Sequence, residues 1–199
     1  MKKNLLKPLI FWQGFPACGL LLNDLASKVN GDIIVYATKP IVPFKNLSEF
    51  ANFKINYINH AHQILDDWEK IKDRNCFIFT GWTHNSLLKL SIKLKKINSS
   101  TISIMTVDNR FKFTLRQVFG SIYFRIFLKS KVDYVFVPGV TSKLLMKFFG
   151  MKDCQIYRGY YGASTLIYKS KISISKRKNY FVFVGSLDKR KSFDILLES

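Results

Sequence analysis

Apolar positions along the chain fall into two patterns, short continuous runs and longer segments with an apolar residue every three or four positions. The first pattern is typical of buried strands and the second of amphipathic helices. We predict strands at 9–12, 32–37, 55–58, 76–80, 101–107, 132–137 and 155–157. We predict helices at 20–29, 64–71, 87–97, 110–131 and 141–149. Because strands and helices alternate and most strands are apolar on both faces, we expect an α/β fold: a Rossmann-like parallel sheet with helices on both faces.

The helix predicted at 110–131 has two different sides. One side is an apolar stripe, broad enough to face the core, formed by Leu115, Val118, Phe119, Ile122 and Ile126. The neighbouring side is cationic and aromatic and carries Lys112, Phe113, Arg116, Tyr123, Phe127 and Lys131. Between Asn109 and Val132 the chain has no acidic residue. This second side predicts a contact with an anionic membrane surface, and packing against a partner or another domain is the alternative.

Composition adds a charge argument to this picture. The chain has 199 residues, 48% of them hydrophobic, which is enough for one domain with a substantial core. Its formal net charge is +19, from 32 Lys and Arg against 13 Asp and Glu. Such an excess favours an anionic partner, either nucleic acid, anionic lipid or a phosphorylated ligand. Biased base composition in the genome is the alternative explanation of the lysine excess.

The cysteines and histidines do not indicate a metal site. The three cysteines, Cys18, Cys76 and Cys154, contain no C-x-x-C pair, which favours reduced, mostly buried thiols in a cytoplasmic protein. His60 and His62 lack further ligands nearby in the sequence, so we interpret them as structural or exposed to solvent. No apolar run approaches the length of a membrane span.

Ligands of open parallel sheets bind beyond the carboxyl ends of the strands, which directs attention to the loops there. Gly14 and Phe15 follow the first strand, and a glycine lets the backbone approach a ligand closely. Trp82 and His84 follow the strand at 76–80 and offer an aromatic plane and an imidazole for sugar recognition. A plain turn at Gly14, and a helix cap in the loop that bears His84, are the alternatives.

Asp108 and Asn109 follow the strand at 101–107. The Asp108 carboxylate could bind a sugar hydroxyl or help to deprotonate an acceptor. Either residue also suits the N-cap of the helix predicted to start at Arg110, and both interpretations stay open.

The last stretch of the chain has its own organisation. Residues 180–184 form an aromatic and β-branched run, Gly185 ends it, and Asp188 to Lys191 form a mostly basic loop before a helical apolar pattern. Such a strand, loop and helix N-terminus suits a phosphate group. A single unit of this kind cannot bury its own faces, so we expect a second domain to begin here. We therefore predict a domain at 1–169, a polar linker at 170–178, and the start of a second, truncated domain at 179–199.

This stretch resembles the opening of the second domain in family 4 of the retaining glycosyltransferases. That family has a strand, then G-R-L-x-x-x-K-G, then a helix reading D-x-L-L-x-A. The residues in this frame are Gly185, Leu187, Lys191, Asp194, Leu196 and Leu197. Ser186 and Ser192 replace the family's Arg and second Gly. The segments 133–150 and 156–162 are similar to the family's preceding strand and helix and to the segment that leads into its hinge.

The resemblance implies the first half of a two-domain GT-B architecture. It implies transfer of a sugar from a nucleotide-sugar donor to a lipid-linked or polysaccharide acceptor, without cofactor or metal. Lys191, with Arg190 in place of the missing Arg, would grip the donor diphosphate. Asp108 stands where many relatives have a His close to the transferred sugar, and the acceptor side would include Gly14, Phe15, Trp82, His84 and Asn109.

We expect the chain by itself to be inactive and to lie in the cytoplasm, at the inner face of the membrane. The alternative is a non-catalytic, basic Rossmann-like module that binds nucleic acid or an anionic membrane. We do not expect nucleic acid as the partner, because the sequence has no recognised nucleic-acid motif and its basic residues are spread along the chain.

Overall fold

The computed structural model describes residues 6–14, 17–39, 49, 51–81, 85–159 and 174–176. The chain divides into two compact units, residues 1–167 and 168–199. In the second unit the described part is a single 3-10 turn, Ile174–Lys176. The strand, loop and helix predicted at 180–199 lie outside the described residues, and the predicted domain division stays a prediction.

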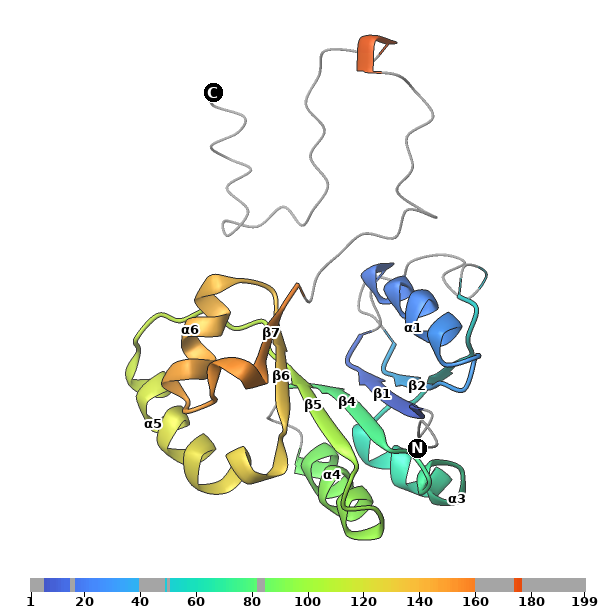
Figure 1. Ribbon diagram of the computed structural model, residues 1–199, viewed down its shortest axis with the longest axis horizontal. Coiled ribbons are helices and arrows are strands. Elements are labelled where there is room, and N and C mark those ends of the chain that lie inside the picture. Colours follow the sequence, from blue (N-terminus) through green and yellow to red (C-terminus); the bar gives the residue numbers. More distant parts are fainter. Residues whose placement is uncertain are drawn as a thin grey trace. The chain divides into compact units, whose positions relative to one another are not determined.

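The first unit is built on a sheet of seven parallel strands in the order β3-β2-β1-β4-β5-β6-β7 (Figure 1). Their bounds are β1 Pro8–Trp12, β2 Ile34–Ala37, β3 Ile55–Tyr57, β4 Cys76–Thr80, β5 Ile102–Thr106, β6 Tyr134–Val137 and β7 Ile156–Arg158. Each predicted strand is present, with ends shifted by two residues at most. The prediction of a Rossmann-like parallel sheet is confirmed.

The order of the strands reverses in the middle of the sheet. From β1 the chain moves outward to β2 and β3, and then returns to the other side of β1 to form β4 and the strands beyond it. Leu9 of β1 is paired with Ile34 of β2 on one side and with Phe77 of β4 on the other. The carboxyl ends of β1 and β4 therefore form the topological switch point, where open sheets of this kind bind ligands.

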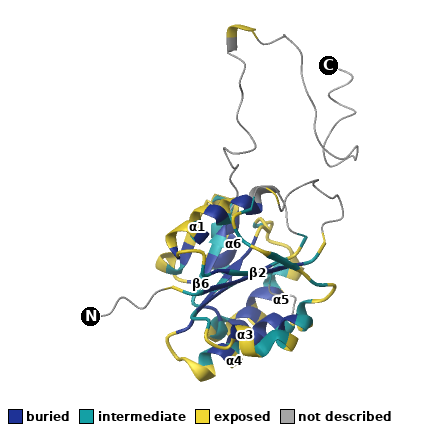
Figure 2. Cartoon of the chain, turned by 90° about the vertical axis from the view of Figure 1, so that its right-hand side faces the viewer, coloured by how far each residue is buried: buried dark blue, intermediate teal, exposed yellow. Residues whose placement is uncertain are grey.

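Helices cover both faces of the sheet (Figure 2). The longer helices are α1 Leu22–Lys28, α4 Asn85–Ile97, α5 Leu115–Tyr123 and α6 Val140–Phe148, with the single turn α3 Trp68–Ile71. The 3-10 helix Ala17–Leu21 precedes α1, and a second one, Ala61–Asp67, precedes α3. Side chains on α1 pack with Ile10 and Val35, whereas the helices after β3 pack with Leu9 and Phe77 on the opposite face.

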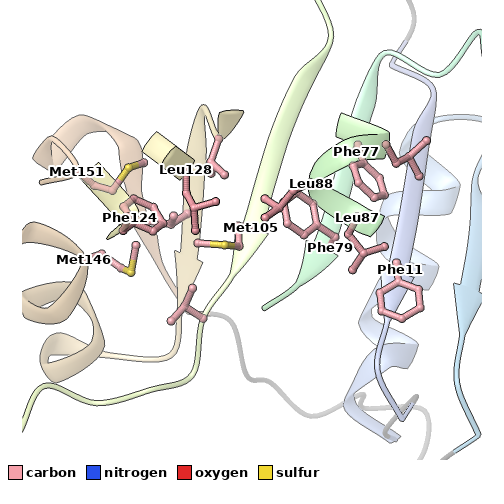
Figure 3. Packing of buried hydrophobic residues seen from close by; sticks show 14 of the residues in the cluster. Phe11, Phe77, Phe79, Leu87, Leu88, Met105, Phe124, Leu128, Met146 and Met151 are labelled. Carbon is pink, nitrogen blue, oxygen red and sulfur yellow. The ribbon is translucent and has the colours of Figure 1, made fainter. Parts of the chain in front are cut away.

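The larger core cluster lies on that second face. Figure 3 shows Phe11, Phe77 and Phe79 of the central strands close to Leu87 of α4. Toward the other edge of the sheet, Phe124 lies with Leu128, Met146 and Met151. Neighbouring residues of a strand point to opposite faces of the sheet, so one strand supplies apolar side chains to the core on each face. This explains why the strand sequences are almost continuously apolar.

The helix predicted at 110–131 differs from its prediction in both its start and its orientation. It begins five residues later, at Leu115, and continues through a π-helical turn, Phe124–Leu128, into a 3-10 turn, Lys129–Lys131. The side that faces the core consists of Gly120, Ser121, Phe124 and Leu128.

The stripe predicted to face the core is instead mostly in solvent. The exposed fractions of its side chains are 76% for Leu115, 69% for Phe119, 51% for Ile122 and 65% for Ile126, and Val118 is partly buried. Both sides of this helix carry apolar residues, so periodicity alone does not decide which side turns inward. The structure buries the other side, with Gly120 and Ser121 on α5 and Phe124 and Leu128 on the π-helical turn.

Two polar features connect the elements around β2. The Tyr36 hydroxyl donates a hydrogen bond of 2.5 Å to Oδ2 of Asp67. Hydrogen bonds from Lys70 first, and from Tyr36 second, hold the pKa of the Asp67 carboxyl below its usual range. Desolvation, reinforced by Asp67, raises the pKa of Tyr36 well above its ordinary value. Arg74 forms an ion pair with Asp32, just before β2.

The cysteines differ from one another. Cys76 is buried at the start of β4, and burial raises the pKa of its thiol to about 11. Cys154 is exposed, which corrects the expectation that it would be buried. The Cys18 side chain lies outside the described residues. Within the part of the chain that the structure describes, no helix is long and apolar enough to cross a membrane.

Candidate functional site

The candidate site is the edge of the sheet where the parallel strands end. The loops after β1, β4, β5, β6 and β7 all emerge there, with their first residues at Gln13, Gly81, Val107, Pro138 and Gly159. The loops after β1 and β4 are central, because the switch point lies between these two strands.

The loop after β1 is fixed by threonines from both neighbouring strands. The backbone N–H of Gly14 donates a hydrogen bond of 2.7 Å to Oγ1 of Thr38, which follows β2. The N–H of Gln13 donates one of 3.1 Å to Oγ1 of Thr80, the last residue of β4. Gly14 has a φ of 61°, in the left-handed region that glycine adopts without strain. The turn is therefore specified by its sequence and brings the backbone to the switch point.

The sequence analysis identified Gly14 but missed these two threonines. The signal available was a hydroxyl residue at the end of each strand next to β1. That signal becomes informative only when the strand order is known, because the order shows that β2 and β4 are the two neighbours of β1 in the sheet.

The loop after β4 turns in a similar way. Gly81 has a φ of 72°, and its N–H donates a hydrogen bond of 3.1 Å to the carbonyl oxygen of Thr106 on β5. Helix α4 then begins at Asn85. Trp82 and His84, which we predict to recognise sugar, lie outside the described residues, as does Phe15. Their roles stay predictions.

The loop from Val107 to Thr114 is held at both of its ends. The N–H of Val107 donates to the carbonyl oxygen of Phe136 on β6, and the N–H of Phe111 donates to that of Thr141 on α6. The Gln117 side chain accepts from the N–H of Lys112 at 2.9 Å and donates to the carbonyl oxygen of Arg110 at 2.8 Å. The ring of Phe111 lies 5.3 Å from that of Phe148, between ring centroids.

Asp108, Asn109 and Arg110 lie between these anchors and are exposed. The structure therefore presents a carboxylate, an amide and a guanidinium on one braced loop at the carboxyl edge of β5. The alternative that Asp108 or Asn109 caps the following helix is wrong, since that helix starts later. Thr114 is its N-cap, and the Thr114 side chain accepts a hydrogen bond from the N–H of Gln117.

Helix α6 starts at the same edge. Its N-cap, Gly139, is extended and offers no side chain to the first turn, so the helix N-terminus has no side-chain cap. Orphan N–H groups at such a terminus favour negatively charged or polar ligands. Among the residues that the structure describes, no group of three or more His, Cys, Asp or Glu side chains gathers to hold a metal ion.

The remaining predicted residues have the following positions. On α5 and the loop before it, Lys112, Arg116, Tyr123 and Phe127 are exposed, and Lys131 is partly buried. Arg190 and Lys191 lie outside the described residues. His60 and His62 are exposed, and their rings stack with centroids 5.5 Å apart.

Comparison by sequence finds no matching family model and no matching curated protein. Comparison by structure finds similarity to an α-glucosyltransferase in complex with UDP-glucose and DNA containing an abasic site. The TM-score is 0.42 and the identity 13%, over 76% of this chain and 41% of that one. A complex of α-glucosyltransferase with UDP and a 13-mer DNA containing an HMU base gives a TM-score of 0.43 and 12% identity, over 80% and 43%.

A third match is an α-glucosyltransferase in complex with UDP, with a TM-score of 0.38 and 12% identity over 76% and 43%. This chain spans about two fifths of the length of these proteins. At such values the similarity is one of general fold, and the functional argument below uses the chain's own residues.

Proposed function

We propose that this chain is the acceptor-side domain of a glycosyltransferase that uses a nucleotide-sugar donor. The observation that carries the proposal is the arrangement at the switch point. There the loops of β1 and β4 each turn through a left-handed glycine, and Thr38, Thr80 and Thr106 bind their backbones. Open parallel sheets bind ligands at such an edge, and the resemblance of 185–197 to the family's donor-phosphate loop supports a sugar nucleotide as the ligand.

Asp108 is the residue proposed to take part in the chemistry. It is exposed on a braced loop at the carboxyl edge of β5, where its carboxylate can accept a hydrogen bond from a hydroxyl group. In the transfer, the acceptor oxygen forms a bond to the anomeric carbon, and the bond from that carbon to the diphosphate breaks. The electron pair leaves with the diphosphate, and Asp108 takes the acceptor proton. Lys191 and Arg190 would meet the charge that develops on the leaving group.

The stereochemistry, the acceptor and the location in the cell are proposed on different grounds. Retention of configuration and a lipid-linked or polysaccharide acceptor in cell-surface glycan synthesis follow from the family resemblance. A cytoplasmic position at the inner face of the membrane is supported by the exposed cationic and aromatic residues of α5. The proposal includes no cofactor besides the nucleotide-sugar substrate.

A direct test is saturation-transfer NMR with the 199-residue chain, nucleotide sugars and small oligosaccharides. We expect transfer to sugar protons, and we expect Asp108→Asn to weaken it because the amide no longer accepts as a carboxylate does. Asp66→Asn is the matched control, since Asp66 is an exposed carboxylate on the 3-10 helix Ala61–Asp67 and does not belong to the loop of Asp108. Absence of sugar signals, or an equal effect of both variants, would contradict the proposal.

Catalysis needs a second test, because we expect the chain alone to be inactive. A half that contains the family's E-x7-E region would supply the donor side. The chain joined to that half should transfer sugar, and the chain alone should not. Robust transfer by the 199-residue chain would refute the second expectation.

The second candidate function is a binding module for nucleic acid, which the net charge of +19 favours. Fluorescence anisotropy with duplex DNA of arbitrary sequence, measured over a series of salt concentrations, distinguishes it. Binding that weakens steeply with salt, without any sugar signal in the NMR test, would favour this candidate over the glycosyltransferase.

A further inference from the structure

The side of α5 that faces solvent is more apolar than a solvated helix surface requires. Leu115, Phe119, Ile122 and Ile126 follow one another at intervals of four, three and four residues, and each is at least half exposed. This spacing keeps four large apolar side chains on one side of the helix. We call these four residues the outward stripe. Isolated exposed apolar residues are ordinary, whereas a continuous row of them marks an interaction surface.

Aromatic side chains extend the outward stripe. Tyr123 and Phe127 are 48% and 51% exposed, and their ring centroids lie 5.1 Å apart. Phe113, just before the helix, is 68% exposed and has a φ of 50°, a conformation that a non-glycine residue seldom adopts. Its ring contacts that of Phe148, with centroids 5.9 Å apart, so a neighbouring helix holds it in its exposed position.

The surroundings of the outward stripe are cationic. Lys112, Arg116, Arg125 and Lys129 are contributed in turn by the loop before the helix, the helix, its π-helical turn and the 3-10 turn that follows, and no acidic residue occurs from 109 to 132. On the neighbouring α6, by contrast, Lys143 and Lys147 are paired with Asp153. We call the four cations beside the stripe the cationic rim.

An open pocket of about 550 Å³ adjoins the end of the stripe. Its lining includes Ile126 of the stripe, Arg125 and Lys129 of the rim, and Lys152. The Arg125 guanidinium donates a hydrogen bond of 2.7 Å to the carbonyl oxygen of Phe148. The Arg125 side chain also lies so close to Gly150 that an added Cβ there would be 3.2 Å from its Cγ and Nε. One cation of the pocket is therefore held in place.

We propose that the outward stripe and the cationic rim dock this protein on a bilayer that contains anionic lipids. In this arrangement α5 lies in the plane of the interface, the apolar side chains enter the acyl boundary, and the pocket beside Ile126 receives a headgroup phosphate. Interfacial helices have this combination of an apolar side with flanking Lys and Arg. The surface differs from the one predicted from sequence, because its apolar part is the stripe that the pattern assigned to the core.

Charge distinguishes a bilayer from the other occupants of such a surface. A second copy of the chain would bring two cationic rims together across a two-fold axis, which is unfavourable without intervening anions. A bilayer with anionic headgroups satisfies the stripe and the rim at the same time.

This inference goes beyond the proposed enzymatic function and does not depend on it. One consequence does rest on that function: α5 begins where the braced loop of Asp108 ends, so docking would hold the candidate site close to the bilayer surface. Vesicle binding and sugar binding are separate measurements, so failure of one is distinguishable from failure of the other.

The test is sedimentation of the 199-residue chain with vesicles of phosphatidylcholine alone or mixed with phosphatidylglycerol. We expect binding to the mixed vesicles only. The double variant Phe119→Ser and Ile126→Ser should lower the partition coefficient at least tenfold, because two apolar side chains no longer enter the bilayer. The matched control is Tyr57→Ser and Ile97→Ser, which replaces an aromatic and an aliphatic residue of 43% and 56% exposure elsewhere.

The cationic rim is tested in the same assay. Lys112→Gln with Arg116→Gln should lower binding to mixed vesicles roughly 30-fold, which corresponds to about 1 kcal/mol for each cation. Lys28→Gln with Lys54→Gln is the control, since Lys28 is exposed on α1 and Lys54 is exposed in the segment before β3. Thermal melting verifies that all variants keep the fold.

Three results would overturn the proposal. The first is absence of binding to mixed vesicles by the unaltered chain. The second is an equal loss of binding in the stripe variant and in its control. The third is a concentration-dependent dimer that the stripe variant abolishes, because a second copy would then be the occupant.

Discussion

Replacement of Phe124 and Phe119 by smaller side chains measures which side of α5 supports the core. The two phenylalanines are five positions apart on the same helical segment, so local helix propensity affects both in a similar way. The apolar periodicity assigns Phe119 to the core, whereas the structure buries Phe124 completely and leaves 69% of Phe119 exposed. Their unfolding free energies therefore test the orientation of the helix directly.

The expected magnitudes follow from burial. Phe124 packs in the larger core cluster, with its ring centroid 5.5 Å from that of Phe149, so Phe124→Ala should cost about 3–5 kcal/mol. Full burial of a phenylalanine stabilises by about 3 kcal/mol at most, and less than a third of Phe119 is buried. Phe119→Ala should therefore cost about 1 kcal/mol or less.

Urea unfolding followed by circular dichroism measures both values under identical conditions. A loss of about 3–5 kcal/mol is comparable with the total stability of many domains, so Phe124→Ala could leave too little folded protein to measure. Phe124→Leu keeps most of the volume and should cost about 1–1.5 kcal/mol. Phe119→Leu is its matched control and should be near neutral.

An inverted order of the two unfolding free energies would contradict this orientation of the helix. If Phe119→Leu destabilised the protein by more than Phe124→Leu, the helix would be turned as the sequence pattern suggests. The outward stripe would then be part of the core, and the proposed bilayer surface would not exist.

Two further predictions concern titratable groups. Tyr36→Phe removes the hydroxyl that donates a hydrogen bond to Asp67 and should cost about 1 kcal/mol at neutral pH. Because hydrogen bonds from Lys70 and Tyr36 lower the pKa of Asp67 in the folded state, this cost should disappear only as the pH falls through that lowered pKa, where the carboxylate becomes protonated in both states. Urea unfolding at several pH values measures it. A thiol reagent at neutral pH should modify the exposed Cys154 and spare Cys76, because the Cys76 thiol is buried and its pKa is raised to about 11. Peptide mass spectrometry after labelling of the folded chain measures the modification of both cysteines. Equal labelling would contradict the burial of Cys76.

The candidate site was predictable from sequence only in part. Gly14 and Asp108 follow recognisable strands, and the rule for parallel sheets places such loops at one edge. The partners of these loops could not be predicted in the same way. Thr38 and Thr80 become neighbours of the β1 loop only through the strand order, and Gln117 braces the Asp108 loop only because the helix starts later than its pattern suggests.

The apolar pattern along the chain was sufficient to predict the fold class and the ends of the strands to within two residues. This was possible because a short apolar run between polar segments can form a buried parallel strand at almost any position in the sheet. The tertiary structure decided the orientation of α5, because a helix with apolar residues on two sides has two ways to bury one of them. In the structure, Gly120 and Ser121 are buried, and Phe124 and Leu128 belong to the same core cluster as residues of β5, β6 and α6. That choice turned the more conspicuous stripe outward and created the surface that we propose to bind a bilayer.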